Sequence, residues 1–417
     1  MFKKSLIAVA ALGAFAGSAM AADISISGRI DTGLNFHDEE VKVGGETTVD
    51  QNTFQMKSGQ YSGSRITIKG SEELGNGMKA GFILENGFDA DDGTFDSNGD
   101  DKMFGREAIV YLEGGFGHFS MGRVGALSSG LGSYNVVYGY TPWGTGWGDY
   151  AGNKGQFMLG DRGRMNNTLT YRSPEFAGVQ IFAQYSLEAD AQEDEQSGNN
   201  KRYAALGASY NLGAFSTGLV VDTVMNGNDD ASRNTEDSFG VSWGASYDFG
   251  VTKPMILVQY GKNENKLGGF SATGFYEDYF TDDKFRLGKN EGLKGYAISL
   301  GAVTPLFGGN LYTSVNFTDG EFDGDVHNQK NKNHGVPGAD ANWVDGARYF
   351  NGDIQRWGVA VGYDYPLSKR TKLYGCAAYN EGELKGNEVR PNKPGLSSSG
   401  KIEETDMEAG VGLIHYF

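Results

Sequence analysis

The sequence predicts an all-β transmembrane protein, an antiparallel barrel of sixteen strands. Three observations carry this prediction: the form of the last strand, a period-two alternation of apolar and polar residues along the chain, and regularly alternating connection lengths. The final strand places apolar side chains at 409, 411, 413 and 417, with His415 in the same row, and the chain stops on Phe417. A strand with one apolar face and a terminal aromatic suits a barrel that closes at the membrane interface.

The N-terminal residues have the features of an export signal. Lys3 and Lys4 form a short basic region, residues 6–15 are apolar, and Ala19-Met20-Ala21 is a small-residue cleavage motif. The apolar run is too short for a membrane-spanning helix, which requires about 20 residues, so an uncleaved anchor is the weaker alternative. We expect a signal peptide at 1–21 and a single barrel domain at 22–417.

The composition favours strands and turns over helices. The 417 residues include 65 glycines, 22 tyrosines and 25 phenylalanines but only 8 prolines. Mean hydropathy is −0.43, as expected when only alternate residues of each strand meet lipid. The single cysteine, Cys376, forms no internal disulfide. Without Lys3 and Lys4 the chain has 34 basic and 53 acidic residues, a net charge of −19, so nucleic acid is an unlikely partner.

Alternation is clearest at 238–249, where Phe239, Val241, Trp243 and Tyr247 share one face and serines and glycines occupy the other. A soluble sandwich would also alternate. The predicted strands are 23–36, 61–70, 78–88, 104–114, 118–124, 165–173, 178–187, 201–212, 214–224, 238–249, 254–264, 294–306, 310–320, 356–365, 371–382 and 404–417.

The connections alternate between short and long, which distinguishes a barrel from a sandwich. Short turns include 72–77, 114–117 and 366–370. The long segments are 37–60, 89–103, 125–163, 188–200, 225–236, 265–293, 321–354 and 383–403. Short periplasmic turns on one rim and long extracellular loops on the other are the outer-membrane arrangement.

Several motifs resemble the Gram-negative general (trimeric) porin family, especially its neisserial and betaproteobacterial type. They are SRITIKGSEELGNGMKA at 64–80, FGREA at 104–108, GGFG at 114–117, MGR at 121–123, NTLTY at 167–171, SPEFAG at 173–178 and LSKRTKLYG at 367–375, followed by the terminal Phe417. The resemblance covers the whole chain in order. It implies a sixteen-stranded outer-membrane barrel, usually a homotrimer, that passes small hydrophilic solutes and ions by passive diffusion, with a third loop folded into the pore. It also implies that barrel-assembly machinery recognises the C-terminal strand.

Basic residues on the predicted lumen face indicate a positive constriction. Alternation with Ile66 and Ile68 points Arg65, Thr67 and Lys69 inward, and Arg164 precedes a strand whose polar face it shares. Arg65, Arg106 and Arg164 also match basic constriction positions of the family that the chain resembles. Arg29 and Lys69 are predicted supporting charges, and Arg123 is a less certain one. The alternative is that all of these are ordinary solvated barrel residues.

The predicted third loop, 125–163, has only two acids, Asp149 and Asp161, and many aromatic residues. A basic wall facing few acids favours anions, whereas acidic outer loops attract cations to the mouth, screened over about 8 to 10 Å. A weak anion preference is the prediction. The loop aromatics suggest an alternative, a substrate-specific porin in which rings stack on sugars, although packing against the wall is the more ordinary role.

Other readings of the sequence are weaker. The acidic run 89–101 could bind a divalent cation, but it lacks the downstream glutamate of an EF-hand, and the family resemblance favours contact with a neighbouring subunit. The five histidines have no serine elbow near them, and there is no phosphate-binding glycine loop, so we predict neither an enzyme nor any cofactor or metal. The alternative from another functional class is a structural or adhesive outer-membrane barrel, which would be distinguished by a lumen filled with side chains.

Overall fold

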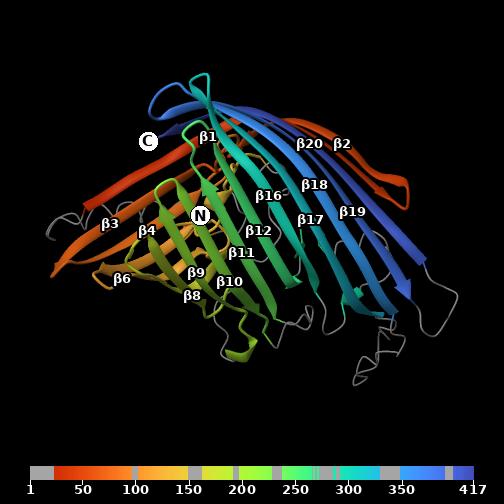
Figure 1. The fold of residues 1–417 in the computed structure, drawn as a ribbon, viewed down its shortest axis with the longest axis horizontal. Helices are drawn as coiled ribbons and strands as arrows, with labels where there is room; N and C mark the ends of the chain where they lie inside the picture. The colour runs from red at the N-terminus through yellow and green to blue at the C-terminus, as the bar shows by residue number, and fades with distance from the viewer. Residues whose placement is uncertain are drawn as a thin grey trace.

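The computed structural model describes residues 23–95, 102–148, 162–190, 197–227, 237–264, 266–267, 270–271, 285–287, 292–328, 348–389 and 398–417. The predicted signal peptide lies outside these ranges. Within them the chain is almost entirely β-strand (Figure 1). No helix among these residues is long and apolar enough to cross a membrane.

Sixteen strands form a closed antiparallel ring in which each strand pairs with its neighbours in the chain. The sheet has eighteen strands, and two of them, β2 (Glu46–Ser58) and β15 (Phe285–Leu287), only extend hairpins beyond the ring. The ring strands are β1 (Asp23–Val43), β3 (Arg65–Gly75), β4 (Met78–Gly87), β5 (Glu107–Gly114), β6 (Gly117–Gly125), β7 (Arg164–Arg172), β8 (Val179–Ser186), β9 (Arg202–Leu212), β10 (Phe215–Met225), β11 (Ser238–Tyr247), β12 (Lys253–Glu264), β16 (Leu293–Leu306), β17 (Gly309–Asn328), β18 (Arg348–Pro366), β19 (Thr371–Val389) and β20 (Ser398–Tyr416). Two strands of two residues each, β13 (Lys266–Leu267) and β14 (Phe270–Ser271), pair with each other as a separate short hairpin.

Each of the sixteen predicted strands corresponds to one strand of this ring, so the predicted fold is confirmed. β1 pairs with β20 from Arg29 opposite Tyr416 to Val43 opposite Ile402, which closes the cylinder. The backbones of Gly28 and Phe417 also exchange two hydrogen bonds, of 3.0 and 3.1 Å.

Side chains alternate between the two faces as the sequence predicts. On β20, Val411 is 59% exposed on the outside while Ile414 is fully buried on the inside. On β11, Trp243 faces outward, and Ser242 and Ser246 are buried on the lumen face. One face therefore suits lipid and the other a wet interior.

Several strands run further than the sequence indicates. The segment 37–60, predicted as a loop, is mostly the upper part of β1 and the paired strand β2. β17 to β20 likewise extend into the segments 321–354 and 383–403. Beyond the membrane both faces of a hairpin are wet, so hydrophobic alternation stops while the backbone ladder continues. The height of the barrel wall therefore differs around the ring: β17 to β20 extend far into the long-loop side, whereas the β3–β4 ladder ends at Arg65 and Gly87.

Candidate pore constriction

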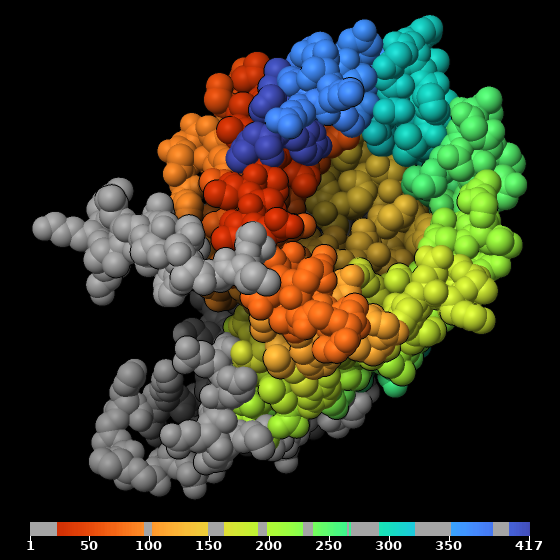
Figure 2. All heavy atoms as spheres, turned by 90° about the vertical axis from the view of Figure 1, so that its left-hand side faces the viewer, coloured from red at the N-terminus to blue at the C-terminus, as the bar shows by residue number. Residues whose placement is uncertain are grey.

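The third loop, described over residues 126–148, lies inside the barrel and crosses from β6 to the opposite wall. Figure 2 shows the ring of strands with chain from the orange-to-yellow part of the sequence inside it. On the far side, Trp143 Nε1 donates to Ser314 Oγ on β17 at 2.6 Å, and Trp147 packs against Tyr61 and Tyr312 with ring centroids 4.3 and 4.6 Å apart. The inward-folded loop is therefore confirmed.

Asp222 on β10 holds both ends of this loop. Ser128, near the start of the loop, donates its hydroxyl to the Asp222 carboxylate. Arg162, at the end of the loop, donates Nε to Asp222 Oδ1 at 3.0 Å and also pairs with Glu264 on β12. Tyr203 donates its hydroxyl to Asp222 at 3.1 Å. These groups are buried, so each charge depends on the others for compensation.

The aromatic side chains of the loop pack against the wall. Exposure is 8% or less for the five that the structure describes, Tyr134, Tyr138, Tyr140, Trp143 and Trp147. Glycines on the lumen face leave room for them: a Cβ on Gly244 would lie 2.4 Å from the Tyr140 ring, and one on Gly362 would lie 2.8 Å from Trp143. Rings buried in this way cannot stack on a solute, so these five give no support to the sugar-stacking alternative. Tyr150 and Phe157 lie outside the described residues.

A second inward segment, residues 59–64, meets the third loop, and the sequence analysis missed it. Its last residues were predicted as the start of a strand at 61–70, but β3 begins only at Arg65. The amides of Trp147 and Gly148 donate to the carbonyls of Tyr61 and Gln60 at 3.2 and 2.6 Å. Gly59, at φ +72°, makes the turn inward.

Three of the predicted arginines meet at this segment and at one wall carboxylate. The Ser62 hydroxyl accepts from Arg29 at 2.9 Å and from Arg65 at 3.0 Å. Glu85 on β4 accepts from Arg65 at 3.2 Å and from Arg106 at 2.9 Å. Arg106 lies just before β5 rather than within it. The structure therefore brings these arginines together, with a neutralising acid among them.

Glu85 was missed by the sequence analysis although a signal was present. It shares the inward face of β4 with Ile83, whereas Phe82 and Leu84 take the other face, so alternation alone would have placed it in the lumen. Its other carboxylate oxygen accepts from Thr67 at 2.8 Å. The side chain is therefore held by three donors.

The other predicted basic residues lie on the same side of the barrel. Arg164, the first residue of β7, is half-buried and within electrostatic range of Arg106, Arg123 and Glu107. Lys69 is exposed on β3, and its charge also reaches Glu107.

Residues 126–148 of the third loop have no charged side chain, and Arg162, described at the end of the loop, pairs with Asp222 and Glu264. The basic wall therefore faces a neutral surface over this stretch. The predicted loop acids, Asp149 and Asp161, lie outside the described residues.

The acidic run 89–101 is described only as far as residue 95. Within it, the Thr94 amide donates to Asp92 at 2.7 Å and holds the pKa of that carboxyl below its usual value. This is the geometry of a turn, and binding of a divalent cation by the run stays the weaker alternative from the sequence.

Comparison with known proteins supports this fold along the whole chain. A family model described as Gram-negative porin matches residues 8–385. Outer membrane porin protein 32 of Delftia acidovorans is 30% identical over 426 residues, covering 100% of both chains. An outer membrane porin protein of Bordetella pertussis is 29% identical over 402 residues, covering 90% of this chain and 94% of the relative.

Comparison with solved structures also supports the barrel fold. The anion-selective porin from Comamonas acidovorans superposes with a TM-score of 0.59 at 21% identity, covering 95% of this chain and 100% of that one. The trimer form of OmpT of Vibrio cholerae superposes at 0.55 with 13% identity and the same coverage. The chain belongs to the Gram-negative porin family, and it is an outer-membrane porin channel of the neisserial and betaproteobacterial type.

Proposed function

We propose that the basic wall gives this channel a weak preference for anions. The single observation that carries the proposal is the charge balance at the level of the third loop. On the side of the barrel around the segment 59–64, the described residues include six basic side chains and four acidic ones, namely Arg29, Arg65, Lys69, Arg106, Arg123 and Arg164 against Asp31, Glu85, Glu107 and Glu408. Elsewhere around the loop, Arg162 and Lys372 pair with Asp222, Glu264 and Asp364. In a narrow, low-dielectric passage an excess of fixed positive charge attracts anions and repels cations.

Two features keep the preference weak. Glu85 neutralises part of the charge of Arg65 and Arg106. Further out, acidic residues of β1 and β20 such as Glu39 and Glu404 lie on the lumen face and favour cations at the mouth. Their influence falls off over about 8 to 10 Å at ordinary salt, so the wall at the loop has the larger effect on an ion that passes it.

The test is the zero-current potential of the purified protein in a planar bilayer under a potassium chloride gradient. We expect an anion-signed potential, with chloride about twice as permeant as potassium, because the excess basic charge lies at the narrowing. A cation-signed potential would contradict the proposal and would mean that the acidic mouth dominates.

We also propose that the mature protein consists of residues 22–417, assembles as a homotrimer, and conducts small hydrophilic solutes and inorganic ions. Support for the trimer comes from the family and from the trimer form of OmpT. The intact mass of the purified chain tests the cleavage after Ala21, and conductance steps in groups of three test the assembly.

Phe417 is proposed as the residue through which the barrel-assembly machinery recognises the chain, and its outward ring as a contact with membrane lipid. Removing Phe417 is expected to deplete most of the assembled protein from the outer membrane, because it deletes both the terminal aromatic and the last backbone bonds to Gly28. Immunoblots of unheated membrane samples measure the folded form. Exchanging Phe417 for tryptophan is the control and should preserve assembly. Equal amounts of folded protein with and without residue 417 would contradict the role.

A further inference from the structure

The inward segment 59–64 joins two like charges through a neutral side chain. Arg29 on β1 and Arg65 on β3 lie directly opposite each other in the strand register, a position in which like charges repel and destabilise a sheet. Both guanidinium groups donate to the hydroxyl oxygen of Ser62, from Nη1 of Arg29 at 2.9 Å and from Nη2 of Arg65 at 3.0 Å. A hydroxyl oxygen has two acceptor lone pairs, so Ser62 accepts both donors without cancelling either charge.

The segment is fixed by carboxylates of the wall on either side of Ser62. The Ser62 amide donates to Asp31 Oδ2 at 2.7 Å, and Tyr374 donates its hydroxyl to the other oxygen of the same carboxylate at 2.6 Å. Asp31 is fully buried. The neighbouring Tyr61 donates its hydroxyl to Asp364 Oδ2 at 3.0 Å. The Ser62 hydroxyl therefore has a defined position on the wall.

The next residue of the segment, Gly63, also contacts the arginines without a charge of its own. Arg65 donates Nε to the Gly63 carbonyl at 2.9 Å, and a Cβ on Gly63 would lie 3.2 Å from Nη1 of Arg106. Glu85 pairs with Arg65 and Arg106. Arg29 is partly exposed and forms no ion pair with an acid in the part of the chain that the structure describes. Its charge is therefore available to ions in the lumen.

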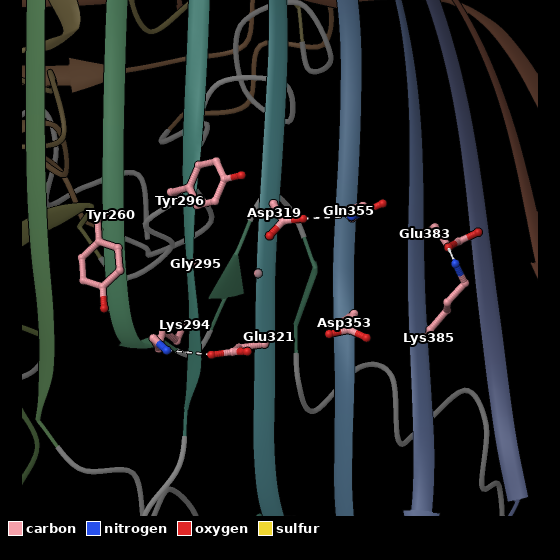
Figure 3. A pocket seen from close by; sticks show the side chains of 11 residues that line it. Tyr260, Lys294, Gly295, Tyr296, Asp319, Glu321, Asp353, Gln355, Glu383 and Lys385 are labelled. Carbon is pink, nitrogen blue, oxygen red and sulfur yellow. Dashed lines mark hydrogen bonds and ion pairs between the residues drawn. The ribbon is translucent and has the colours of Figure 1, made fainter.

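Basic residues elsewhere on the barrel are compensated in a different way. An outward groove of about 360 Å³ on β16 to β19 contains Lys294 and Lys385 (Figure 3). Lys294 pairs with Glu321 at 2.7 Å, and Lys385 pairs with Glu383. Such pairs cancel the charge of each lysine. The acceptor that Arg29 and Arg65 share is neutral instead, so both positive charges remain.

We propose that Ser62 is a specificity-determining residue of the channel, because its neutral hydroxyl holds Arg29 beside Arg65 as a doubly positive part of the wall. This inference rests on the proposed anion preference and names a residue that sets it. An acid at position 62 would accept the same two donors but would cancel one of the two charges. The side chain at 62 thus decides how much of the arginine charge acts on a passing ion.

The first test is the zero-current potential of Ser62→Asp in a planar bilayer under a potassium chloride gradient. The added negative charge lies between two arginines, and we expect the ratio of chloride to potassium permeability to fall by about fivefold. The sign of the potential then changes from anion to cation. The control Ser368→Asp adds the same charge in the short turn 366–370, where the serine hydroxyl accepts from the Arg370 amide at 3.1 Å. It should leave the potential unaltered, and equal shifts in the two variants would overturn the inference.

A second pair of variants changes the hydroxyl without changing the charge, so it tests the role even if a carboxylate beside Asp31 prevents S62D from folding. Ser62→Ala leaves the two guanidinium groups without their common acceptor. They then move apart, and the permeability ratio should fall by about twofold. Ser62→Thr retains the hydroxyl and should retain the ratio. If S62A lowers only the amount of folded protein, while its channels keep the unaltered ratio, Ser62 has a structural role alone and the inference is wrong.

The unaltered protein, measured in the same series, separates this inference from the proposed function. A cation-signed potential of the unaltered protein would contradict the anion preference itself. An anion-signed potential that neither S62D nor S62A changes would leave the anion preference intact and overturn the role of Ser62.

Discussion

Replacing Asp222 with asparagine is expected to release the third loop and make the open channel noisy. Asparagine has nearly the same shape, but it removes the charge that Arg162 requires and presents an amide donor to it. Breaking one side of a buried ion pair costs roughly 3 to 5 kcal/mol. Glu264 still compensates Arg162, so we expect a value near the lower end, about 3 kcal/mol.

The effect should be specific because Asp222 holds both ends of the loop. Ser128 and Arg162 are 34 residues apart in sequence, yet both donate to this one carboxylate. Weakening it frees the loop at its two attachment points on β10, while the tryptophans at the far wall still hold its tip. A loop whose ends are held less firmly changes position within the lumen, and the ion current then fluctuates.

Single-channel current noise in planar bilayers measures the movement of the third loop, and thermal unfolding in detergent measures the loss of stability. The control is Asp248→Asn, the same chemical change in a short turn, where the side chain only accepts from the Gly250 amide at 2.7 Å. Quiet channels of normal conductance from D222N would show that the loop is held by its packing alone.

Prediction from sequence worked best where membrane physics constrains every second residue. All sixteen ring strands could be placed because lipid requires an apolar outer face, and both the closure at Phe417 and the inward loop are confirmed. The upper part of β1 and its partner β2 were not predicted, because the constraint from lipid is absent there. Outside the bilayer neither face needs to be apolar, so residues such as Glu39 and Glu40 gave no periodic signal.

The candidate site could be predicted in part. Arg29, Arg65 and Arg106 were named from alternation and family resemblance, and the structure places them together. Their partners were not found, because the inward turn at 59–64 depends on Gly59 and on contacts with a loop more than eighty residues away in the chain.

The lumen positions of Asp222 and Glu85 could have been predicted from the sequence. Each is an acid on the lumen face of a strand whose pattern was already assigned. The resemblance to the porin family points to basic residues of the constriction and gives no signal for these two acids. Inward glycines such as Gly244 and Gly362 were a further unused signal, because a missing side chain on a lumen wall leaves space for something packed against it.

Replacing Glu85 with glutamine is expected to raise anion selectivity. The Glu85 side chain is only 13% exposed and pairs with both Arg65 and Arg106, so it is the main local compensation for two charges of the basic wall. Removing one negative charge beside the ion path changes the energy of a passing ion by about 0.5 kcal/mol after screening. The energy of chloride falls and that of potassium rises by this amount, so the ratio of chloride to potassium permeability should rise by about fivefold.

Ionic strength provides an internal check on this mechanism. At 1 M salt the screening length falls to about 3 Å, so the difference between E85Q and the unaltered protein should shrink there and grow in dilute potassium chloride. A change of pore size would persist at all salt concentrations. Comparing zero-current potentials at two mean concentrations thus separates an electrostatic effect from a steric one.

The matched control is Glu381→Gln, which removes the same charge from the outward face of β19, away from the lumen. It should leave selectivity unaltered. Glutamine at 85 still accepts a hydrogen bond from one arginine, which limits the cost of leaving two largely buried guanidinium groups without their carboxylate. If E85Q and E381Q shift the potential equally, selectivity follows the net charge of the whole protein, and the local wall of Arg65 and Arg106 has no special role.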